Sequence, residues 1–299
     1  MAHKRRLRHY AEYVLLQVVE WLVRPLPRRF TVRLAGWVGR ALVLGGVRRR
    51  LVEQQLAVAL GPAVPGDAER SRLVHAVYQN TILTFLEFLQ QAVQRRDLVV
   101  RIEREPVAAR LLAAGPILMV TGHIGNWEAF GVFLAEYGLR GVMLAKPLHN
   151  PLLQQRIVQR RTALNGVELI LTGDSMKAVL EAVRQGKCVG FVADQDAGES
   201  GLFVDFFGQP ASTARGPALF AISTGAPLVP MFLVREPSPE RRLVLHVGEP
   251  LFANPAADKQ AEIKRLTEAH TRQLEVIVRQ HPADYFWLHR RWKTRPVTS

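Results

Sequence analysis

The chain has 299 residues, of which 48% are hydrophobic and 22% charged, and its formal net charge is +14. This composition is typical of a globular protein with one large or two small domains, and it excludes a disordered chain. A disulfide-stapled fold is also excluded because the chain has one cysteine, while the positive charge indicates an anionic partner such as a nucleic acid, a bilayer surface or an acidic carrier protein.

The first predicted element is an amphipathic helix over residues 10–24. Apolar side chains recur at helical spacing in residues 14–22, and residues 1–50 carry twelve Lys or Arg side chains against two acidic ones. The apolar run is too short to span a bilayer and is interrupted by Glu12 and Glu20. We therefore predict a helix that lies in the interface of an anionic bilayer, with a helix packed on the rest of the protein as the alternative.

Further helices are predicted up to residue 100. Breaks are expected at Pro25, at Gly45 and Gly46, and within residues 61–66, and a long helical pattern follows over residues 68–93. The sequence thus predicts a helical N-terminal region, residues 1–100, that packs on the core.

The pattern changes near residue 116, where short apolar runs begin to alternate with helical patterns. Such alternation favours an α/β fold with a mostly parallel central sheet flanked by helices. We predict this core over residues 101–299, ending in a helix over 259–279 and a basic aromatic tail over 285–296. The expected strands lie at 117–121, 142–145, 168–171, 188–193, 228–234 and 243–247.

A glycine-rich turn with a histidine and a glutamate follows the first of these strands. Residues 121–128 read Thr-Gly-His-Ile-Gly-Asn-Trp-Glu, and in α/β folds ligands gather at the carboxyl ends of strands. On one continuous helix, His123 and Glu128 would lie about 140° apart. Gly122 and Gly125 supply a turn that allows the two side chains to meet.

A paired imidazole and carboxylate is suited to activating an alcohol. Attack of a hydroxyl on a thioester needs a base that removes its proton, and a carboxylate on the far nitrogen fixes the imidazole tautomer. The alternative for His123 is a buried histidine that binds the backbone of a turn. His270 and Glu275 have the same spacing inside the predicted closing helix, where we interpret them as a solvated helical face.

Two further clusters are candidates for site residues. Asp194 and Asp196 follow the predicted strand 188–193, either as a wall of a site or as a capped turn. Arg160 and Arg161 lie in a helical stretch and either bind an anionic headgroup or face water. Cys188 is predicted to be inert packing within a strand, and neither a nucleophile elbow nor metal-ligand spacing is present.

These segments together resemble the lipid A biosynthesis acyltransferases, the late lauroyl and myristoyl type, within the wider lysophospholipid acyltransferase-like superfamily. The resemblance covers roughly residues 117–296 in the family's order. The segments that carry it are Gly122 to Glu128, Asn150 through Arg161 to residue 166, Ala193 to Gly198, Phe207 through Thr213 to Pro230, and the tail from Trp287 to Pro296.

The resemblance implies an O-acyltransferase that moves a fatty acyl group directly from acyl carrier protein or coenzyme A to a hydroxyl of a lipid A precursor. No bound cofactor is implied, and the expected location is the cytoplasmic face of the inner membrane, with a monotopic or single N-terminal helix. His123 would be the base and Glu128 its partner. Substrate-binding positions expected on the same basis are Asn126, Arg160, Arg161, Asp194, Asp196 and Thr213.

Other functions remain open at this point. The same catalytic pair suits another acceptor, such as a phosphoinositide mannoside, a lysophospholipid or an aminolipid. A membrane-bound scaffold without chemistry is a second class, against which the intact His123 and Glu128 count. Nucleic-acid binding is a third, motivated by basic termini near Trp287 and Trp292, but no nucleic-acid module is recognisable and we expect none to bind specifically.

Overall fold

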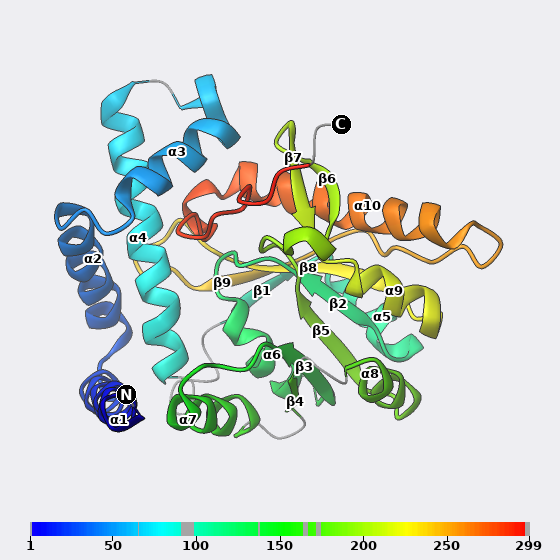
Figure 1. The fold of residues 1–299 in the computed structure, drawn as a ribbon, viewed down its shortest axis with the longest axis horizontal. Coiled ribbons are helices and arrows are strands. Elements are labelled where there is room, and N and C mark those ends of the chain that lie inside the picture. The colour runs from blue at the N-terminus through cyan, green and yellow to red at the C-terminus, as the bar shows by residue number, and fades with distance from the viewer. Residues whose placement is uncertain are drawn as a thin grey trace.

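The computed structural model describes residues 2–64, 66–90, 99–136, 138–163, 167–171 and 175–296. A helical N-terminal region lies beside a layered α/β body (Figure 1). The N-terminal helices are α1 (Ala2–Val23), α2 (Arg28–Leu44), α3 (Arg49–Leu60) and α4 (Asp67–Gln90), and the short 3₁₀ turn η1 (Gly61–Ala63) follows α3. The predicted breaks at residues 25, 45–46 and 61–66 all fall between these helices, and α4 corresponds to the predicted helix over 68–93, of which residues 91–93 lie outside the described part.

The central sheet has seven strands in the order β1-β9-β8-β2-β5-β3-β4. All neighbouring pairs are parallel except β8 with β9, which is antiparallel. The strands are β1 (Val99–Glu103), β2 (Leu118–Thr121), β3 (Gly141–Ala145), β4 (Val167–Leu171), β5 (Cys188–Val192), β8 (Leu228–Arg235) and β9 (Leu243–Val247). The predicted α/β class with a mostly parallel sheet is confirmed.

Alternating side chains of the strands enter two apolar layers, one on each face of the sheet. In β2, Met119 belongs to the layer formed with α5 (Glu105–Ala114) and α6 (Phe130–Glu136). Its neighbours Leu118 and Val120 belong to the opposite layer, which includes residues of α8 (Ser175–Arg184), α9 (Gly216–Thr224) and α10 (Lys259–Gln280). Burial on both faces explains why these strands appear in the sequence as continuous apolar runs.

Each predicted strand of the core is present within one or two residues, and the closing helix is present as α10. Two features were not predicted. β1 forms an edge of the sheet, and the antiparallel hairpin of β6 (Leu202–Phe206) and β7 (Gln209–Thr213) makes a separate two-stranded sheet. The remaining helix of the core is α7 (Pro151–Thr162), and short 3₁₀ turns are η2 (Trp127–Ala129), η3 (Gly198–Ser200) and η4 (Pro282–Asp284).

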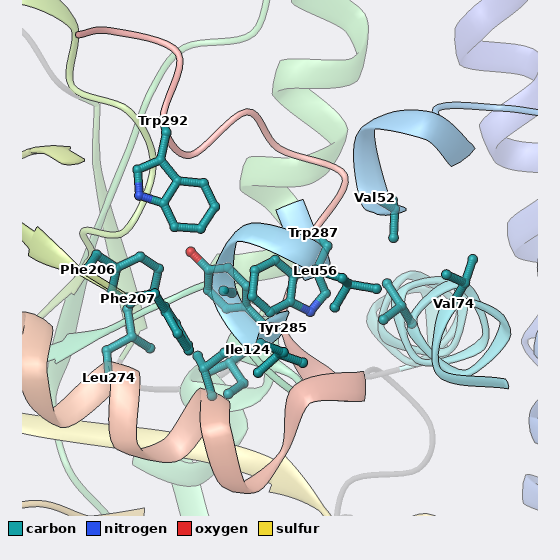
Figure 2. Close-up of a cluster of buried hydrophobic side chains, with 14 of the residues drawn as sticks. Val52, Leu56, Val74, Ile124, Phe206, Phe207, Leu274, Tyr285, Trp287 and Trp292 are labelled. Carbon is teal, nitrogen blue, oxygen red and sulfur yellow. The ribbon is translucent and has the colours of Figure 1, made fainter. Parts of the chain in front are cut away.

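One buried apolar cluster contains residues of the N-terminal helices, the hairpin, α10 and the C-terminal tail. Figure 2 shows Val52 and Leu56 of α3 near Trp287 and Tyr285 of the tail. The indole of Trp287 is completely buried. The helical region and the α/β body therefore share a common core at this point.

Most of the larger apolar side chains of α1 point to the outside of the protein, whereas Val19 and Val23 pack against α2 and α4. Among the helix's larger apolar residues, Leu7, Tyr10, Leu15 and Trp21 are 59%, 62%, 64% and 75% exposed, whereas Glu20 is 6% exposed. This orientation is the reverse of that in a helix packed on a water-soluble core. Within the described part of the chain, no single helix is long and apolar enough to cross a bilayer. α2 and α3 together have the necessary length and composition, but the chain bends by 98° between them.

Candidate active site

His123 lies opposite Asp194 because they follow two neighbouring parallel strands. β2 and β5 are paired up to Thr121 and Val192, and the backbone N–H of Ala193 donates to the carbonyl of Thr121 at 3.0 Å. Two residues beyond each strand, the Nδ1 atom of His123 is 2.6 Å from Oδ1 of Asp194. The backbone N–H of His123 donates to the other carboxylate oxygen at 2.8 Å.

The carboxylate at Nδ1 of His123 is therefore Asp194, in the position predicted for Glu128, and the catalytic role of Glu128 stays a prediction. Burial by itself raises the pKa of Asp194, but the charge and hydrogen bonds of His123 outweigh this effect and lower it to about 2. An ionised Asp194 accepts the Nδ1 proton. The tautomer that results leaves Nε2 of His123 with a free lone pair, which is the form a general base requires.

The amide of Gln195 and two aromatic rings surround the imidazole of His123. Nε2 of Gln195 lies 3.3 Å from Nε2 of His123 and donates to it in this tautomer. The rings of Trp127 and Phe286 are 4.9 Å and 6.1 Å from the imidazole, measured between centroids, and Phe85 of α4 packs edge-on against Trp127 at 6.3 Å. The His123 side chain remains 19% exposed, so a substrate hydroxyl can reach it.

The turn between His123 and Glu128 has a shape that depends on Gly125 and Asn126. Gly125 has a φ of +57°, and a Cβ atom there would lie 1.7 Å from the carbonyl oxygen of Leu233. Asn126 caps η2, since its side-chain oxygen accepts from the backbone N–H groups of Glu128 and Ala129, each at 3.1 Å. The glycine-dependent turn is thus present as predicted.

A buried charge network supports this turn from α4. The side-chain amide of Asn126 donates to Glu87 at 2.7 Å, and Glu87 is paired with Arg235 at 2.7 Å and also with Arg28. Burial raises the pKa of Glu87, but the two guanidinium groups have the larger combined effect and lower it. Asn126 is itself fully buried, so it shapes the turn from within instead of lining a surface for substrate.

Glu128 is bonded to Arg161 of α7. Oε1 of Glu128 is 2.5 Å from Nη2 of Arg161, and Oε2 is 2.9 Å from Nε, which makes a bidentate pair. The carboxylate side chain is 13% exposed and the guanidinium side chain 28%. The structure therefore brings Glu128 and Arg161 together beside the turn that carries His123.

The C-terminal tail also holds the same turn in place. Ile124 forms an antiparallel bridge with Tyr285, and the backbone N–H of Phe286 donates to the carbonyl of His123 at 2.8 Å. Trp287 and Trp292 are 0% and 8% exposed, so these indoles are not available to stack on nucleic-acid bases. The tail belongs to the support of the site.

Three predicted substrate-binding residues, Arg160, Asp196 and Thr213, bond to other groups of the protein. Arg160 is 8% exposed in its side chain and is paired with Glu20 of α1, and Asp196 accepts hydrogen bonds from the backbone and hydroxyl of Thr294 at 3.1 Å and 2.8 Å. Thr213 is 1% exposed and accepts a hydrogen bond from Arg291 at 2.5 Å. These contacts stabilise the helices and the tail around the site, and the role of the three residues toward a substrate stays a prediction.

A small cavity of about 10 Å³ lies behind Asp194. His270, Thr271 and Arg291 line it, and among the described residues each has a buried side-chain atom without a hydrogen-bond partner. Burial, with a smaller contribution from Arg291, lowers the pKa of His270 to about 4. The interpretation of His270 and Glu275 as a solvated face is therefore wrong, since His270 is 4% exposed and Glu275 accepts a hydrogen bond from the backbone of Phe207.

Neither a nucleophilic cysteine nor a metal cluster is found at this site. Cys188 is buried in β5, and burial raises the pKa of its thiol, as predicted for inert packing. Within the described residues, no three or more His, Cys, Asp and Glu side chains are grouped so as to hold a metal ion.

Gln195 and the aromatic residues around His123 were not predicted. Gln195 lies between the two acids that were singled out, and Trp127 lies within the glycine-rich turn, so both were in the correct segments but carried no chemical signature. The pairing of His123 with Asp194 had a partial signal, because the predicted strands 117–121 and 188–193 end just before these two residues and parallel strands end at one edge of a sheet. That the two strands are neighbours is known only from the structure.

Comparisons with known proteins identify relatives along the whole chain. The family model of bacterial lipid A biosynthesis acyltransferases matches residues 1–294. The lipid A biosynthesis lauroyltransferase of Escherichia coli (strain K12) is 26% identical over 291 residues, covering 93% of this chain and 90% of that protein. The phosphatidylinositol mannoside acyltransferase of Mycobacterium tuberculosis (strain CDC 1551 / Oshkosh) is 29% identical over 186 residues, which are 60% of this chain and 56% of that protein. This chain thus spans little more than half the length of the mycobacterial enzyme that it matches.

Proposed function

The chain belongs to the bacterial lipid A biosynthesis acyltransferase family, and we propose that it transfers a fatty acyl group from a thioester to a hydroxyl of a lipid A precursor. The observation that carries the chemical part of this proposal is the hydrogen bond of 2.6 Å between His123 and the buried Asp194. It leaves a basic nitrogen at a partly exposed position beside apolar rings. A phosphoinositide mannoside is the second candidate acceptor, supported by the similarity to the mycobacterial enzyme.

The proposed reaction is a direct transfer. The substrate hydroxyl replaces the amide of Gln195 at Nε2 of His123, and its proton moves to Nε2 as its oxygen attacks the thioester carbonyl. Asp194 stabilises the imidazolium that forms. When the tetrahedral intermediate collapses, the carbon–sulfur bond breaks and the proton on Nε2 neutralises the departing thiolate. The ester and the free thiol of the donor are the products.

Glu128 and Arg161 have a different role in this proposal. Their bidentate pair fixes Arg161 beside the turn, with about a quarter of its side chain exposed. A guanidinium held in this way is suited to a phosphate group of the acceptor. We assign the acyl chain to the apolar surface of Trp127 and Phe85, of which Phe85 is 47% exposed, because each buried CH₂ gains roughly 0.8 kcal/mol.

An anionic bilayer is the proposed partner of the exposed apolar faces of α1 and α2. Besides the outward face of α1, α2 presents Phe30, Trp37 and Leu44, which are seven residues apart and 54%, 66% and 82% exposed. Exposed arginines of α2 accompany this face, namely Arg29, Arg33 and Arg40. Aromatic and basic side chains together are typical of helices at the headgroup level of anionic membranes.

The proposal places the protein on the cytoplasmic face of the inner membrane as a monotopic enzyme. Its acyl donor is carried by acyl carrier protein or by coenzyme A, both of which are acidic. The net charge of +14 favours association with either of them and with anionic lipid.

The test is an assay with purified protein, acyl carrier protein and coenzyme A thioesters of several chain lengths, and a lipid extract. Mass spectrometry identifies the lipid that gains the mass of an acyl group. We expect His123→Ala to lower kcat by about 10²- to 10⁴-fold with the fold intact by circular dichroism. Wild-type turnover in that variant, or the absence of any acylated lipid with the wild type, would contradict the proposal.

A further inference from the structure

Glu20 of α1 forms a buried ion pair with two arginines of α7. Its Oε1 atom is 2.6 Å from Nη2 of Arg156, and its Oε2 atom accepts from Nε of Arg160 at 3.2 Å. The side chains of Glu20 and Arg160 are each 8% exposed. Figure 1 shows α1 and α7 next to each other at the lower edge of the molecule.

α7 also packs on β4, and Arg160 contacts the end of α4. None of the residues of Pro151–Thr162, all of which the structure describes, is buried. Its N-terminus is also held by α1, since the side-chain amide of Asn150 donates to Glu12 at 2.9 Å and to the carbonyl of His9 at 3.0 Å. α1 thus holds α7 near both of its ends, through polar contacts.

A displacement of α7 would be transmitted to the candidate active site. Arg160 is followed directly by Arg161, whose guanidinium holds Glu128 in two hydrogen bonds. Arg160 also donates to the carbonyl of Leu89 at 3.0 Å, at the end of α4. Since neighbouring residues share a backbone, the pairing of Arg160 with Glu20 determines where Arg161 can reach.

We propose that Glu20 and Arg156 are positioning residues that couple the docking of α1 on the bilayer to the placement of Arg161 and Glu128. The outward face of α1 is apolar and its inward face carries Glu12 and Glu20, so the element that meets the lipid is the one that holds α7. A bilayer that binds α1 in this position stabilises α7 as well, because a ligand shifts an equilibrium toward the state that it binds better. This inference rests on the proposed membrane docking, while the acyl transfer is one of its readouts.

The experiment compares wild type with Glu20→Gln, in the presence and absence of vesicles of phosphatidylethanolamine and anionic phosphatidylglycerol. Three quantities are measured: co-sedimentation with the vesicles, amide hydrogen exchange of residues 151–162, and the kcat and KM of acyl transfer. Glu53→Gln is the matched control, since Glu53 forms an exposed pair with Arg49 on α3.

In the wild type, vesicles slow the exchange of residues 151–162. Glu20→Gln binds vesicles as the wild type does but loses this protection, and its kcat/KM for the lipid acceptor falls about a hundredfold with little change in the KM of the thioester, as for a binding group misplaced by ~1 Å. Glu53→Gln behaves as the wild type in all three measurements. The exchange measurement needs no turnover, so the coupling is tested even if the proposed reaction is incorrect.

Two outcomes would overturn the coupling. One is exchange in α7 that does not respond to vesicles in the wild type, and the other is a Glu20→Gln variant with full protection and a full kcat/KM for the acceptor. If Glu20→Gln does not fold, Arg156→Gln and Arg160→Gln decide, because each removes one of the two guanidinium groups that pair with Glu20 and neither alters α1. The double exchange Glu20→Arg with Arg156→Glu again places a carboxylate beside two arginines and restores both the protection and the kcat/KM, whereas a merely disruptive effect of the single variants would not be rescued.

Discussion

The carboxylate that bonds to Nδ1 of His123 follows a strand next to the one that His123 follows. In the structure, Asp194 accepts from Nδ1 of His123 and from its backbone N–H, while Glu128 holds Arg161. A spacing of five residues in the sequence therefore did not predict the hydrogen-bond partners of His123 and Glu128. Asp194 and Glu128 therefore have different hydrogen-bond partners, and substitutions of each can separate their effects.

We predict that Asp194→Asn lowers kcat by about 10⁴-fold. An asparagine amide donates a hydrogen bond to Nδ1 and thereby leaves the proton on Nε2, where the tautomer cannot act as a base. Glu128→Gln keeps the tautomer and is expected to raise the KM of the acceptor more than it lowers kcat. The two variants are compared by steady-state kinetics over a range of pH, and equal losses of kcat in both would contradict this division of roles.

His270 makes the stability of the protein depend on pH. Its pKa falls from 6.5 in the unfolded chain to about 4 in the folded protein, so the unfolded state binds more protons between these values. The contribution of His270 to the free energy of unfolding is fully present above pH 6.5, and about 3 kcal/mol of it is lost as the pH decreases to 4. Asp194 and Glu262, each with a pKa lowered to about 2, titrate below this window.

The measurement is urea unfolding of wild type and His270→Gln from pH 4 to pH 7. Glutamine does not titrate, so the variant is expected to lose most of this slope even if it is less stable at neutral pH. An unchanged slope in the variant would show that other groups cause the acid sensitivity.

At the scale of elements, the turn of residues 122–128 is held by close approach of backbone to backbone. Gly125 has a positive φ and no space for a Cβ atom, because the carbonyl of Leu233 lies there. That carbonyl accepts from the backbone N–H of Asn126 at 2.9 Å. The turn is therefore fastened to β8 and cannot move independently of it.

Gly125→Ala is predicted to destabilise the protein by roughly 3 kcal/mol or more and to reduce activity, since both the backbone conformation and the contact with Leu233 are lost. Gly208→Ala is the matched control: Gly208 has a φ of +72° and nothing within 4 Å of the Cβ position. Gly208→Ala is expected to lower the free energy of unfolding by about 1–2 kcal/mol, because only the left-handed backbone conformation is unfavourable there. Urea midpoints measure both, and equal values would show that the contact with Leu233 contributes nothing.

The elements that the sequence predicted well are those whose burial leaves a pattern. β2, β5 and β8 are apolar along their length because they are covered on both faces, and α10 has a regular helical stripe. β1 at the edge of the sheet reads Val-Val-Arg-Ile-Glu and has no such run. Strand order and register are set by tertiary packing, which is why the pairing of His123 with Asp194 required the structure.

At the scale of the whole molecule, the sequence predicts an amphipathic helix near the N-terminus that lies in a bilayer interface, with a helix packed on the protein as the alternative. Periodicity is the same whether the apolar side is covered by protein or by lipid. In the structure, Leu15 and Trp21 face outward, and Glu20 binds α7. This orientation and the exposed aromatic residues of α2 extend the proposed membrane contact beyond the predicted helix.

We predict that the protein binds anionic vesicles and that Leu15→Ser lowers its partition coefficient about tenfold, since an exposed leucine gains roughly 1.5 kcal/mol on burial. Arg33→Gln lowers it by a similar factor at low salt, because each basic residue near the surface contributes about 1 kcal/mol. Raising the salt concentration reduces the effect of Arg33→Gln and not that of Leu15→Ser, because screening acts on charges alone. Phe252→Ser removes an equally exposed apolar side chain that follows β9, 62% exposed, and is expected to leave binding unchanged. If Phe252→Ser weakened co-sedimentation as much as Leu15→Ser does, the membrane contact would not be confined to the N-terminal helices, and the orientation proposed for the enzyme would have to be abandoned.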